Sequence, residues 1–474
     1  MLFHSTRGKD SGKTFEQVLM QGLASDGGLF MPDTWPQVDI QKLKQADTFI
    51  DVAKHIVPLF TKSSFADEEV IEMIENTWHD FSDSSFAPIK ELDDTKSVLE
   101  LFYGPTGAFK DFGLQLAAAF FNKTLTKHNK TAIVFGATSG DTGSAAIDAC
   151  RRFESIKSFI LLPGGNMSEV QRRQMTTVDS PNVFTLIVDG TFDDCQAIVK
   201  EAFNERSFLK DDQYLLAVNS INWVRIIGQI CYYFYASLKI NKFEESLNFS
   251  VPTGNFGNVF ACYSAHKMGM PLNKILVAVN SNNILHRFFS NNDYSRTEVY
   301  ETDSPSMDIS VASNFERLIY DFYAERDASL CNDYYSNFPI SPIKLEDDTW
   351  KKSKDLFLSY CVDDISTVNA MKKNYDSFHY LMDPHTAVAS EAVDELSTKL
   401  EGKTIILSTA HPAKFPLVVE KAGLSLEDIP SWEGRFATEE YEAVMDQSKS
   451  IALTLDWEDG RSDVLSGAEI YQLV

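Results

Sequence analysis

The chain has 474 residues, of which 44% are hydrophobic and 23% are charged, so it is long enough for two or three domains with large cores. This composition excludes a largely disordered chain. The formal net charge of −25 disfavours nucleic acid and anionic membranes as partners, and an anionic substrate has to be captured by local donors.

The sequence carries no signal for a membrane or an oxidising compartment. The first residues lack an apolar signal core, and no uninterrupted apolar run is long enough to span a bilayer. Six cysteines are scattered without CxxC pairs, a pattern typical of reduced thiols. We therefore expect a cytoplasmic enzyme without a metal site.

The predicted elements alternate between strands and helices after a mainly helical region at residues 1–95. Helical patterns cover Phe112–Phe120 and Gln196–Phe203. Strands are predicted where short apolar runs recur without alternation, which is typical of parallel strands buried on both faces. These runs are Ala132–Phe135, Phe159–Leu162, Phe184–Val188, Leu215–Val218, Phe249–Val251, Ile275–Val279 and Ile405–Leu407. The alternation predicts a doubly wound α/β architecture.

Domain boundaries are soft because no low-complexity linker or internal repeat separates the parts. After the N-terminal region we expect a first α/β domain at 96–240 and a second at 241–474. The stretch at about 285–375 is rich in aromatic and acidic residues, and we expect it to be a helical insertion.

Polar loops follow four of the predicted strands, and we expect them to lie together at one sheet edge. Ligands in open parallel sheets bind outside the carboxyl ends of the strands. Any one of these loops alone has the composition of an ordinary connection, but four together predict a site. The loops begin G-A-T-S-G-D-T-G at 136, N-S-I-N-W at 219, P-T-G-N-F-G-N at 252 and S-T-A-H-P-A-K at 408.

Lys110 stands out in the stretch G-P-T-G-A-F-K-D-F-G at 104–113. It is set between Phe109 and Asp111 directly after a turn. A surface lysine needs no such framing, whereas a reactive lysine needs a partly dry pocket to act as a nucleophile or base. The alternative is a buried structural lysine.

The loop T-G-N-F-G-N at 253–258 has the composition of an anion site. Gly254 and Gly257 allow close approach of the backbone, and successive amides before a helix form an anion-binding nest. We expect it to bind a phosphate group. A plain glycine turn entering a helix is the alternative.

The stretch A-T-S-G-D-T-G-S-A-A at 137–146 is rich in hydroxyls before an alanine-rich helix start. Thr138, Ser139 and Thr142 beside helix amides suit a carboxylate. Asp141 is awkward beside an anion, so it points away, caps the helix or meets a positive partner.

Taken together, these motifs resemble the longer branch of the threonine synthase family, within the fold type II pyridoxal-phosphate enzymes. The resemblance also rests on Q-G-L-A-S-D-G-G-L-F-M-P at 21–32 and D-P-H-T-A-V-A at 383–389. It implies two doubly wound, mostly parallel sheets flanked by helices, and pyridoxal 5'-phosphate as cofactor. It further implies a lyase of class EC 4.2.3.1 that acts in the last step of threonine biosynthesis.

The resemblance assigns roles to residues of this chain. Lys110 takes the position of the lysine that forms the Schiff base with the cofactor. Thr409 matches the hydroxyl facing the pyridine nitrogen, which leaves the ring a weaker electron sink than a carboxylate would. The residues that match the cofactor-phosphate loop are Gly254, Asn255, Phe256, Gly257 and Asn258. Asp141 stands where the wider fold type usually has Asn, so it either touches substrate or only orders its loop.

The implied reaction converts O-phospho-L-homoserine and water into L-threonine and phosphate by γ-elimination and β-addition of water. The substrate phosphate needs a second anion site, and the candidates are Arg225 and Lys414, helped by Ser220 and Asn222. Each cation has pairing with an acidic residue as its alternative.

Two other functions remain open on the sequence. One is a related phospholyase that releases 2-oxobutanoate, ammonia and phosphate, and the other is a pyridoxal-phosphate-binding protein without turnover. Monomer and homodimer are both open as oligomeric states.

Overall fold

The computed structural model describes residues 1–138, 140–163 and 168–428, and the backbone of four short strands between 449 and 471. The described chain forms two compact units, each built from separate stretches of sequence. Unit 1 comprises Met1–Gly113 and Ser220–Trp432, and unit 2 comprises Leu114–Asn219 and Glu433–Val474. Helix α6 (Lys110–Lys127) runs across the first boundary.

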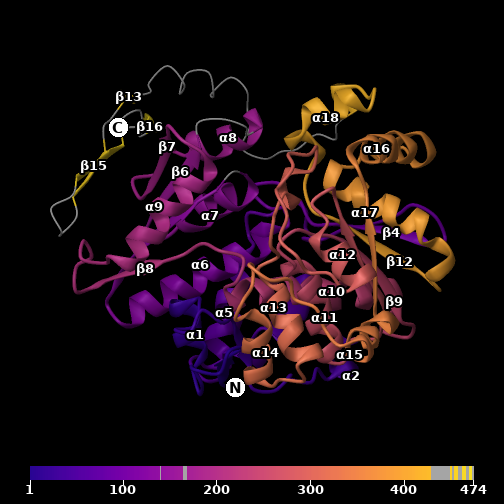
Figure 1. Ribbon diagram of the computed structural model, residues 1–474, viewed down its shortest axis with the longest axis horizontal. Coiled ribbons are helices and arrows are strands. Elements are labelled where there is room, and N and C mark those ends of the chain that lie inside the picture. Colours follow the sequence, from indigo (N-terminus) through magenta and orange to yellow (C-terminus); the bar gives the residue numbers. More distant parts are fainter. Residues whose placement is uncertain are drawn as a thin grey trace. The chain divides into compact units, whose positions relative to one another are not determined.

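Unit 1 has an N-terminal part that is mainly helical, followed by a sheet with its helices (Figure 1). The N-terminal part contains β1 (Phe3–Ser5), α1 (Phe15–Gln21), β2 (Phe30–Pro32), α2 (Ile40–Leu43), α3 (Phe49–Ile56), α4 (Pro58–Thr61) and α5 (Asp67–Thr77). The strands of the sheet are β3 (Ile89–Glu91), β4 (Lys96–Glu100), β9 (Leu247–Pro252), β10 (Leu272–Val279), β11 (Phe357–Cys361) and β12 (Thr404–Ser408). The remaining helices are α10 (Trp223–Asn241), α11 (Gly257–Lys267), α12 (Ile284–Asn291), α13 (Phe315–Leu318), α14 (Ala328–Tyr335), α15 (Asp347–Lys351), α16 (Asp364–Phe378), α17 (Pro384–Glu395) and α18 (Pro416–Lys421).

The sheet of unit 1 has the order β11-β10-β9-β12-β4-β3 and is parallel except for β3, which is antiparallel to β4. All six residues of β9 are buried, as expected of a central strand covered on both faces. The hydroxyl of Ser250 donates to the carbonyl of Ala389 in α17 at 2.8 Å. The ring of the preceding residue, Phe249, packs on the ring of Tyr233 in α10, with 5.1 Å between the ring centres. Because successive side chains point to opposite faces, α17 and α10 cover opposite faces of the strand.

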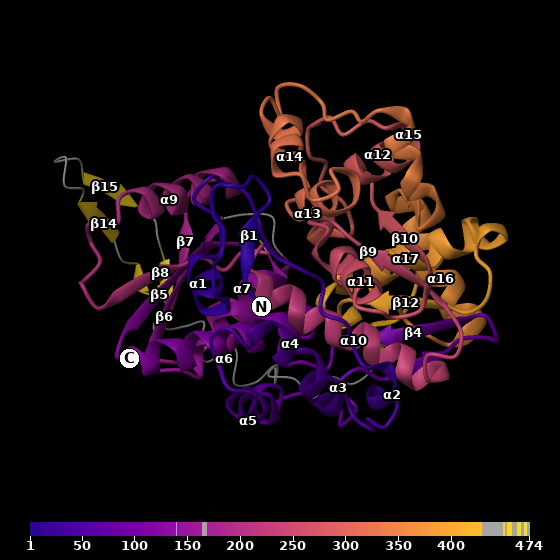
Figure 2. The same cartoon turned by 90° about the horizontal axis from the view of Figure 1, so that it is seen from below.

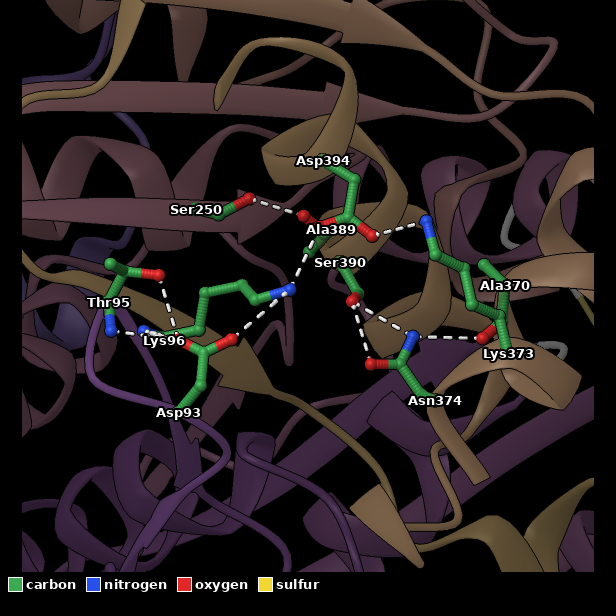
Figure 3. A network of polar contacts seen from close by, with 10 residues as sticks. All are labelled: Asp93, Thr95, Lys96, Ser250, Ala370, Lys373, Asn374, Ala389, Ser390 and Asp394. Carbon is green, nitrogen blue, oxygen red and sulfur yellow. Dashed lines mark hydrogen bonds and ion pairs between the residues drawn. The ribbon is translucent and has the colours of Figure 1, made fainter. Parts of the chain in front are cut away.

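Helix α17 is fixed by polar contacts to its neighbours, some of them buried (Figure 3). Asn374 in α16 donates to the hydroxyl of Ser390 in α17 at 3.1 Å. At the far end of α17, Asp394 accepts from Lys96 in β4 at 3.0 Å and from Lys373 in α16 at 2.8 Å. These contacts fix the helix that starts at Asp383 and Pro384 against the sheet.

Unit 2 also combines a sheet with helices (Figure 2). Its sheet has the order β13-β16-β7-β6-β5-β8, with the four strands from β7 to β8 parallel. The strands are β5 (Thr131–Ala137), β6 (Ile156–Pro163), β7 (Val183–Val188), β8 (Gln213–Leu216), β13 (Lys449–Ser450) and β16 (Glu469–Tyr471), with a separate hairpin of β14 (Leu453–Asp456) and β15 (Ser462–Leu465). Most of α6 belongs to unit 2. The other helices of the unit are α7 (Asp141–Arg151), α8 (Glu169–Thr176) and α9 (Phe192–Asn204).

The predicted strands all form, but their grouping differs from expectation. The four polar loops do not leave one sheet edge, because β5 and β8 belong to the sheet of unit 2, and β9 and β12 to that of unit 1. The predicted boundary at 96 also falls elsewhere, since β4 pairs with β12 and so joins the sheet predicted for the second domain. The stretch 285–375 is mostly helical but includes β11, which pairs with β10.

Within the described part of the chain, no helix combines the length and the apolar character needed to cross a membrane.

Candidate active site

Lys110 is the first residue of α6 and follows a turn that is fixed by Asp111. The carboxylate of Asp111 accepts from the Thr106 amide at 2.9 Å and from the Thr106 hydroxyl at 2.7 Å. The turn is tight, because a Cβ built on Gly104 would lie 2.4 Å from the Asp111 carboxylate. Lys110 itself is half-buried, with its Nζ 5.9 Å from the centre of the Phe109 ring. As expected from the sequence, Lys110 follows a tight turn and lies beside Phe109 and Asp111.

The loop after β12 lies against this turn. The amide of Phe109 donates to the carbonyl of Thr409 at 2.9 Å, and the amide of His411 donates to the carbonyl of Gly107 at the same distance. Thr409 is buried. Two segments about 300 residues apart in sequence are thus joined by backbone bonds directly before Lys110, and Thr409 is placed beside the turn.

The loop after β9 has the backbone of an anion nest. Phe256 adopts the left-handed conformation, with φ 62° and ψ 3°, and α11 begins at the next residue, Gly257. A left-handed residue at the start of a helix turns successive amides towards one point, where the helix dipole also favours negative charge. Gly254 lies close to another backbone, since a Cβ there would be 3.0 Å from Cα of Met307.

Asn258, in the first turn of α11, carries an unmatched donor. Its Oδ1 accepts from the hydroxyls of Tyr232 and Tyr233, the latter at 2.7 Å. Its Nδ2 is buried and has no hydrogen-bond partner among the described residues. A buried donor without an acceptor is destabilising by about 1–3 kcal/mol, so an anion at this helix start would relieve it. The loop therefore fits a phosphate group.

Residues around Ser306 cover the loop at Gly254 and are themselves held by a histidine. Nε2 of His385 accepts from the Ser306 amide at 3.1 Å, and its Nδ1 lies 2.8 Å from Oδ1 of the buried Asp383. Nδ1 of His385 consequently carries the proton, which it donates to Asp383. This pair of motif residues, D-P-H at 383–385, acts as a structural hydrogen-bonding unit.

Arg225 is a buried cation with unmatched donors. It lies in the first turn of α10, and its Nε and Nη1 have no hydrogen-bond partner among the described residues. Burial lowers its pKa to about 10, which still leaves it charged at neutral pH. An unpaired buried guanidinium is unfavourable, and an oxyanion with two free oxygens suits it.

The other candidates for the substrate phosphate have different surroundings. Ser220 lies 2.9 Å, hydroxyl to hydroxyl, from Ser313. Asn222 caps α10 by accepting from Val224 at 3.2 Å and also donates to the carbonyl of Leu19. Their predicted contact with substrate stays a prediction.

The hydroxyl-rich loop of unit 2 precedes α7. The hydroxyl of Thr138 accepts from the amides of Gly140 and Gly143 at 3.3 and 3.1 Å. Asp141 is buried and accepts from Nε2 of Gln171 in α8 at 2.9 Å, which supports a role in ordering the loop. Thr142 lies one residue further along the helix, and Ser139 lies outside the described residues.

Three family models match the chain in consecutive order. Residues 2–78 match the threonine synthase N terminus, residues 98–331 match the pyridoxal-phosphate dependent enzymes, and residues 386–451 match the C-terminal part of threonine synthase. A threonine synthase from Pseudomonas aeruginosa is 43% identical over 426 residues, which cover 90% of this chain and 91% of the relative. The chain belongs to the threonine synthase family.

Solved structures agree with this placement. The chain is similar to a pyridoxal-phosphate-bound threonine synthase from Brucella melitensis, with a TM-score of 0.85 and 37% identity, covering 89% of this chain and 91% of that one. The yeast threonine synthase gives the same TM-score and identity, with 94% coverage of both chains. The predicted fold type, the cofactor pyridoxal 5'-phosphate and the lyase activity of class EC 4.2.3.1 are thereby confirmed.

Sequence reasoning did not select the residues that hold the loops in place. Asp383 and His385 lie in the D-P-H-T-A-V-A motif at 383–389, but the contact of His385 with Ser306 follows only from the fold. The segment S-N-F-E-R at 313–317 lies inside the predicted insertion, to which the sequence assigns no role in the site. A signal is present, since Asn314 and Arg317 lie within two residues of Phe315 in a segment rich in aromatic residues.

Proposed function

We propose that this chain converts O-phospho-L-homoserine and water into L-threonine and phosphate, with Lys110 as the residue that bonds the cofactor aldehyde. The arrangement of Lys110 carries the proposal. The lysine begins a helix, its turn is fixed by Asp111, and the Thr409 loop is bonded to the residue before it. A lysine held in this way is suited to covalent bonding and to repeated proton transfer.

The loop Gly254–Asn258 is the proposed site for the cofactor phosphate. Its support is the left-handed Phe256, the start of α11 and the unmatched Nδ2 of Asn258. Thr409 is the proposed partner of the ring nitrogen. When bound, the cofactor supplies an electron sink for the carbon atoms next to the substrate amine.

Arg225, together with Ser220, is the proposed site for the phosphate of the substrate. Among the described residues the buried guanidinium has no partner for its Nε and Nη1 donors, so a phosphate ester offers it acceptors. The same contact would hold the phosphate as it leaves from the γ carbon. The hydroxyls and amides of Thr138, Thr142 and the start of α7 are proposed to receive the substrate carboxylate, and Asp141 to order that loop.

Proton transfer is assigned to Nζ of Lys110. The amine removes the proton from the α carbon and then one from the β carbon, and the phosphate departs with the γ C–O bonding electrons. Water adds its oxygen and one hydrogen at the β carbon, and its other proton goes to the released phosphate. The two protons held by the amine return to the α and γ carbons. Every atom of water and substrate then appears in threonine and phosphate.

The same proposal places the enzyme in the cytoplasm without a nucleic-acid partner. It is supported by the net charge of −25 and by the six cysteines, all of which are free thiols in the described chain.

The test is a product assay on the purified protein with its cofactor. Phosphate and threonine should appear from O-phospho-L-homoserine in equal amounts, and Lys110→Ala should lose turnover and the visible absorption of the lysine-bound cofactor while staying folded. Lys372→Ala, which removes a lysine from the exposed side of α16, is the control and should keep both. Release of 2-oxobutanoate and ammonia in place of threonine, or an active Lys110→Ala enzyme, would contradict the proposal.

A further inference from the structure

The segment Ser313–Arg317 contacts both of the loops assigned to phosphate groups. Nδ2 of Asn314 donates to the carbonyl of Ser220 and to the carbonyl of Asn255, at 3.1 Å in each case. The amide of Asn314 donates to the same Asn255 carbonyl at 3.0 Å. A single buried side chain therefore joins the loop after Asn219 to the loop before α11.

Ser313 makes a second connection between the same two loops. Its hydroxyl lies 2.9 Å from the hydroxyl of Ser220 and donates to Oδ1 of Asn255 at 3.1 Å. The side chains of Ser220 and Asn255 are thus bridged by one hydroxyl, and their carbonyls are bridged by Asn314. Movement of either loop alone would break bonds at two neighbouring residues.

Arg317 fixes the side chain of Asn314. The guanidinium is fully buried, donates from Nη1 to Oδ1 of Asn314, and donates from Nη2 to the carbonyl of Ile221 at 2.6 Å. Its Nε donates to the carbonyl of Phe30 at 3.1 Å, and the group lies 5.1 Å from the ring centre of Trp223. Burial lowers its pKa to about 9, so it remains cationic at neutral pH. Oδ1 of the Asn314 side chain accepts the hydrogen bond from Arg317. The side-chain amide of Asn314 therefore faces the two loops with its donor, Nδ2.

We propose that Ser313 and Asn314 are positioning residues that set the separation between the cofactor phosphate and the substrate phosphate. This inference rests on the proposed function, which assigns those two groups to Asn255 and its neighbours and to Ser220 with Arg225. A fixed separation selects phosphate esters of amino acids by the number of carbon atoms between the amine-bearing carbon and the phosphate. The bridge thereby determines the length of the accepted substrate.

The test compares the bridge with a matched pair in the same unit. Ser313→Ala and Asn314→Ala remove the bridge without adding charge, and Ser313→Thr keeps its hydroxyl. The controls are Ser390→Ala and Asn374→Ala, which remove another buried and mutually hydrogen-bonded Ser–Asn pair (Figure 3). Each protein is freed of cofactor and titrated with pyridoxal 5'-phosphate, followed by absorbance. KM, kcat and inhibition by O-phospho-L-serine, which is one carbon shorter, are then measured.

Asn314→Ala loses two hydrogen bonds that fix the loops. Its affinity for the cofactor should fall by about tenfold and its KM should rise by about tenfold, while kcat should change by less than about threefold. The preference for the homoserine ester over O-phospho-L-serine should narrow. Ser313→Ala should show the same changes at smaller size, and Ser313→Thr should resemble the unmodified protein. The two control variants should have a lower Tm but unchanged cofactor affinity, KM and substrate preference.

Unchanged cofactor affinity and unchanged length preference in Ser313→Ala and Asn314→Ala would overturn the inference. If Asn314→Ala does not fold, Ser313→Ala decides, because Ser313 is only half-buried. A protein that makes no threonine contradicts the proposed function, and the cofactor titration then still decides whether the bridge holds the loop at Asn255.

Discussion

Nζ of Lys414 donates a 2.9 Å hydrogen bond to the carbonyl of Thr106, in the turn that precedes Lys110. Lys414 is fully buried, and it comes from the S-T-A-H-P-A-K loop, whose backbone also bonds this turn. Its contact with the turn suggests a second role for a lysine assigned to the substrate phosphate. That assignment stays a prediction, and substitution of Lys414 separates the two roles.

Lys414→Met should mainly destabilise the turn, since it leaves the Thr106 carbonyl without this donor. We expect the free energy of unfolding to fall by about 1–3 kcal/mol, measured by urea titration. If Lys414 acts through the turn, KM should change by less than about threefold, which is under 1 kcal/mol of lost substrate binding. A large rise in KM with unchanged unfolding would instead assign Lys414 to the substrate phosphate.

Two glycines of the same loop should differ in their tolerance of alanine. In Gly254→Ala the new Cβ meets the Met307 backbone at 3.0 Å and the Ser306 carbonyl at 3.3 Å, whereas in Gly257→Ala it meets a side-chain nitrogen of Asn314 at 3.4 Å. Forcing backbone apart costs about 1–3 kcal/mol, so Gly254→Ala should weaken cofactor binding by about tenfold or more.

Gly257→Ala serves as the comparison within the loop, and its cofactor affinity should stay within about threefold, because 3.4 Å is ordinary contact. Titration of the cofactor-free proteins measures both. If Gly257→Ala binds the cofactor more weakly than Gly254→Ala, contact with the segment at Ser306 does not determine the conformation of the loop.

Arg225→Met should stabilise the protein without substrate while removing substrate binding. The substitution takes away a buried charge whose Nε and Nη1 have no partner among the described residues. Replacing such a charge with an apolar side chain should raise the free energy of unfolding by about 1–3 kcal/mol, seen as a higher Tm.

Inorganic phosphate provides the control for Arg225. It should raise the Tm of the unmodified protein through binding to the folded state, and this increase should be lost in Arg225→Met. Arg225→Lys keeps the charge without the planar fork and should retain part of the increase. Equal phosphate effects in all three proteins would remove Arg225 from the anion site.

His411 should make stability depend on pH below about 6.5. Burial lowers its pKa from 6.5 to about 4, so the unfolded chain takes up a proton before the folded protein does. The free energy of unfolding is therefore unaffected above pH 6.5 and decreases as pH falls towards 4. For this residue alone, the decrease between pH 7 and pH 5 amounts to about 2 kcal/mol.

His411→Asn isolates this contribution, because an asparagine oxygen can still accept from the Ala413 amide that Nδ1 of His411 accepts from at 3.2 Å. Unfolding free energies of both proteins should be measured at pH 7 and pH 5. The variant should lose less stability than the unmodified protein over that interval, and the same loss in both would disprove the assignment to His411.

The strands and the principal loops could be predicted because their signals are local. Runs such as Ile275–Val279 are apolar on both faces, and the glycines around Lys110 and Phe256 reveal tight backbone in the sequence itself. The pairing of β4 with β12 could not be predicted, since it joins residues about 300 positions apart. The strand β11 was missed because its residues are largely half-buried and lie among helical patterns.

The same limit applies to the polar residues that hold the site. Asn314 and Arg317 are buried, yet nothing in their neighbours along the chain reveals which carbonyls they meet. Their partners at Phe30, Ser220 and Asn255 come from three distant segments. Residues that bind ligands sit in loops with a recognisable composition, whereas residues that align those loops are recognised only once the fold is known.

The pairing of β16 with β7 has a consequence for how the protein is made. β7 ends at residue 188, but its outer edge is covered by residues 469–471 in antiparallel register. During synthesis that edge remains open to other chains until residues 469–471 have left the ribosome. Nascent chains therefore depend on residues 469–471, or on a chaperone, to keep this edge from joining a neighbouring copy.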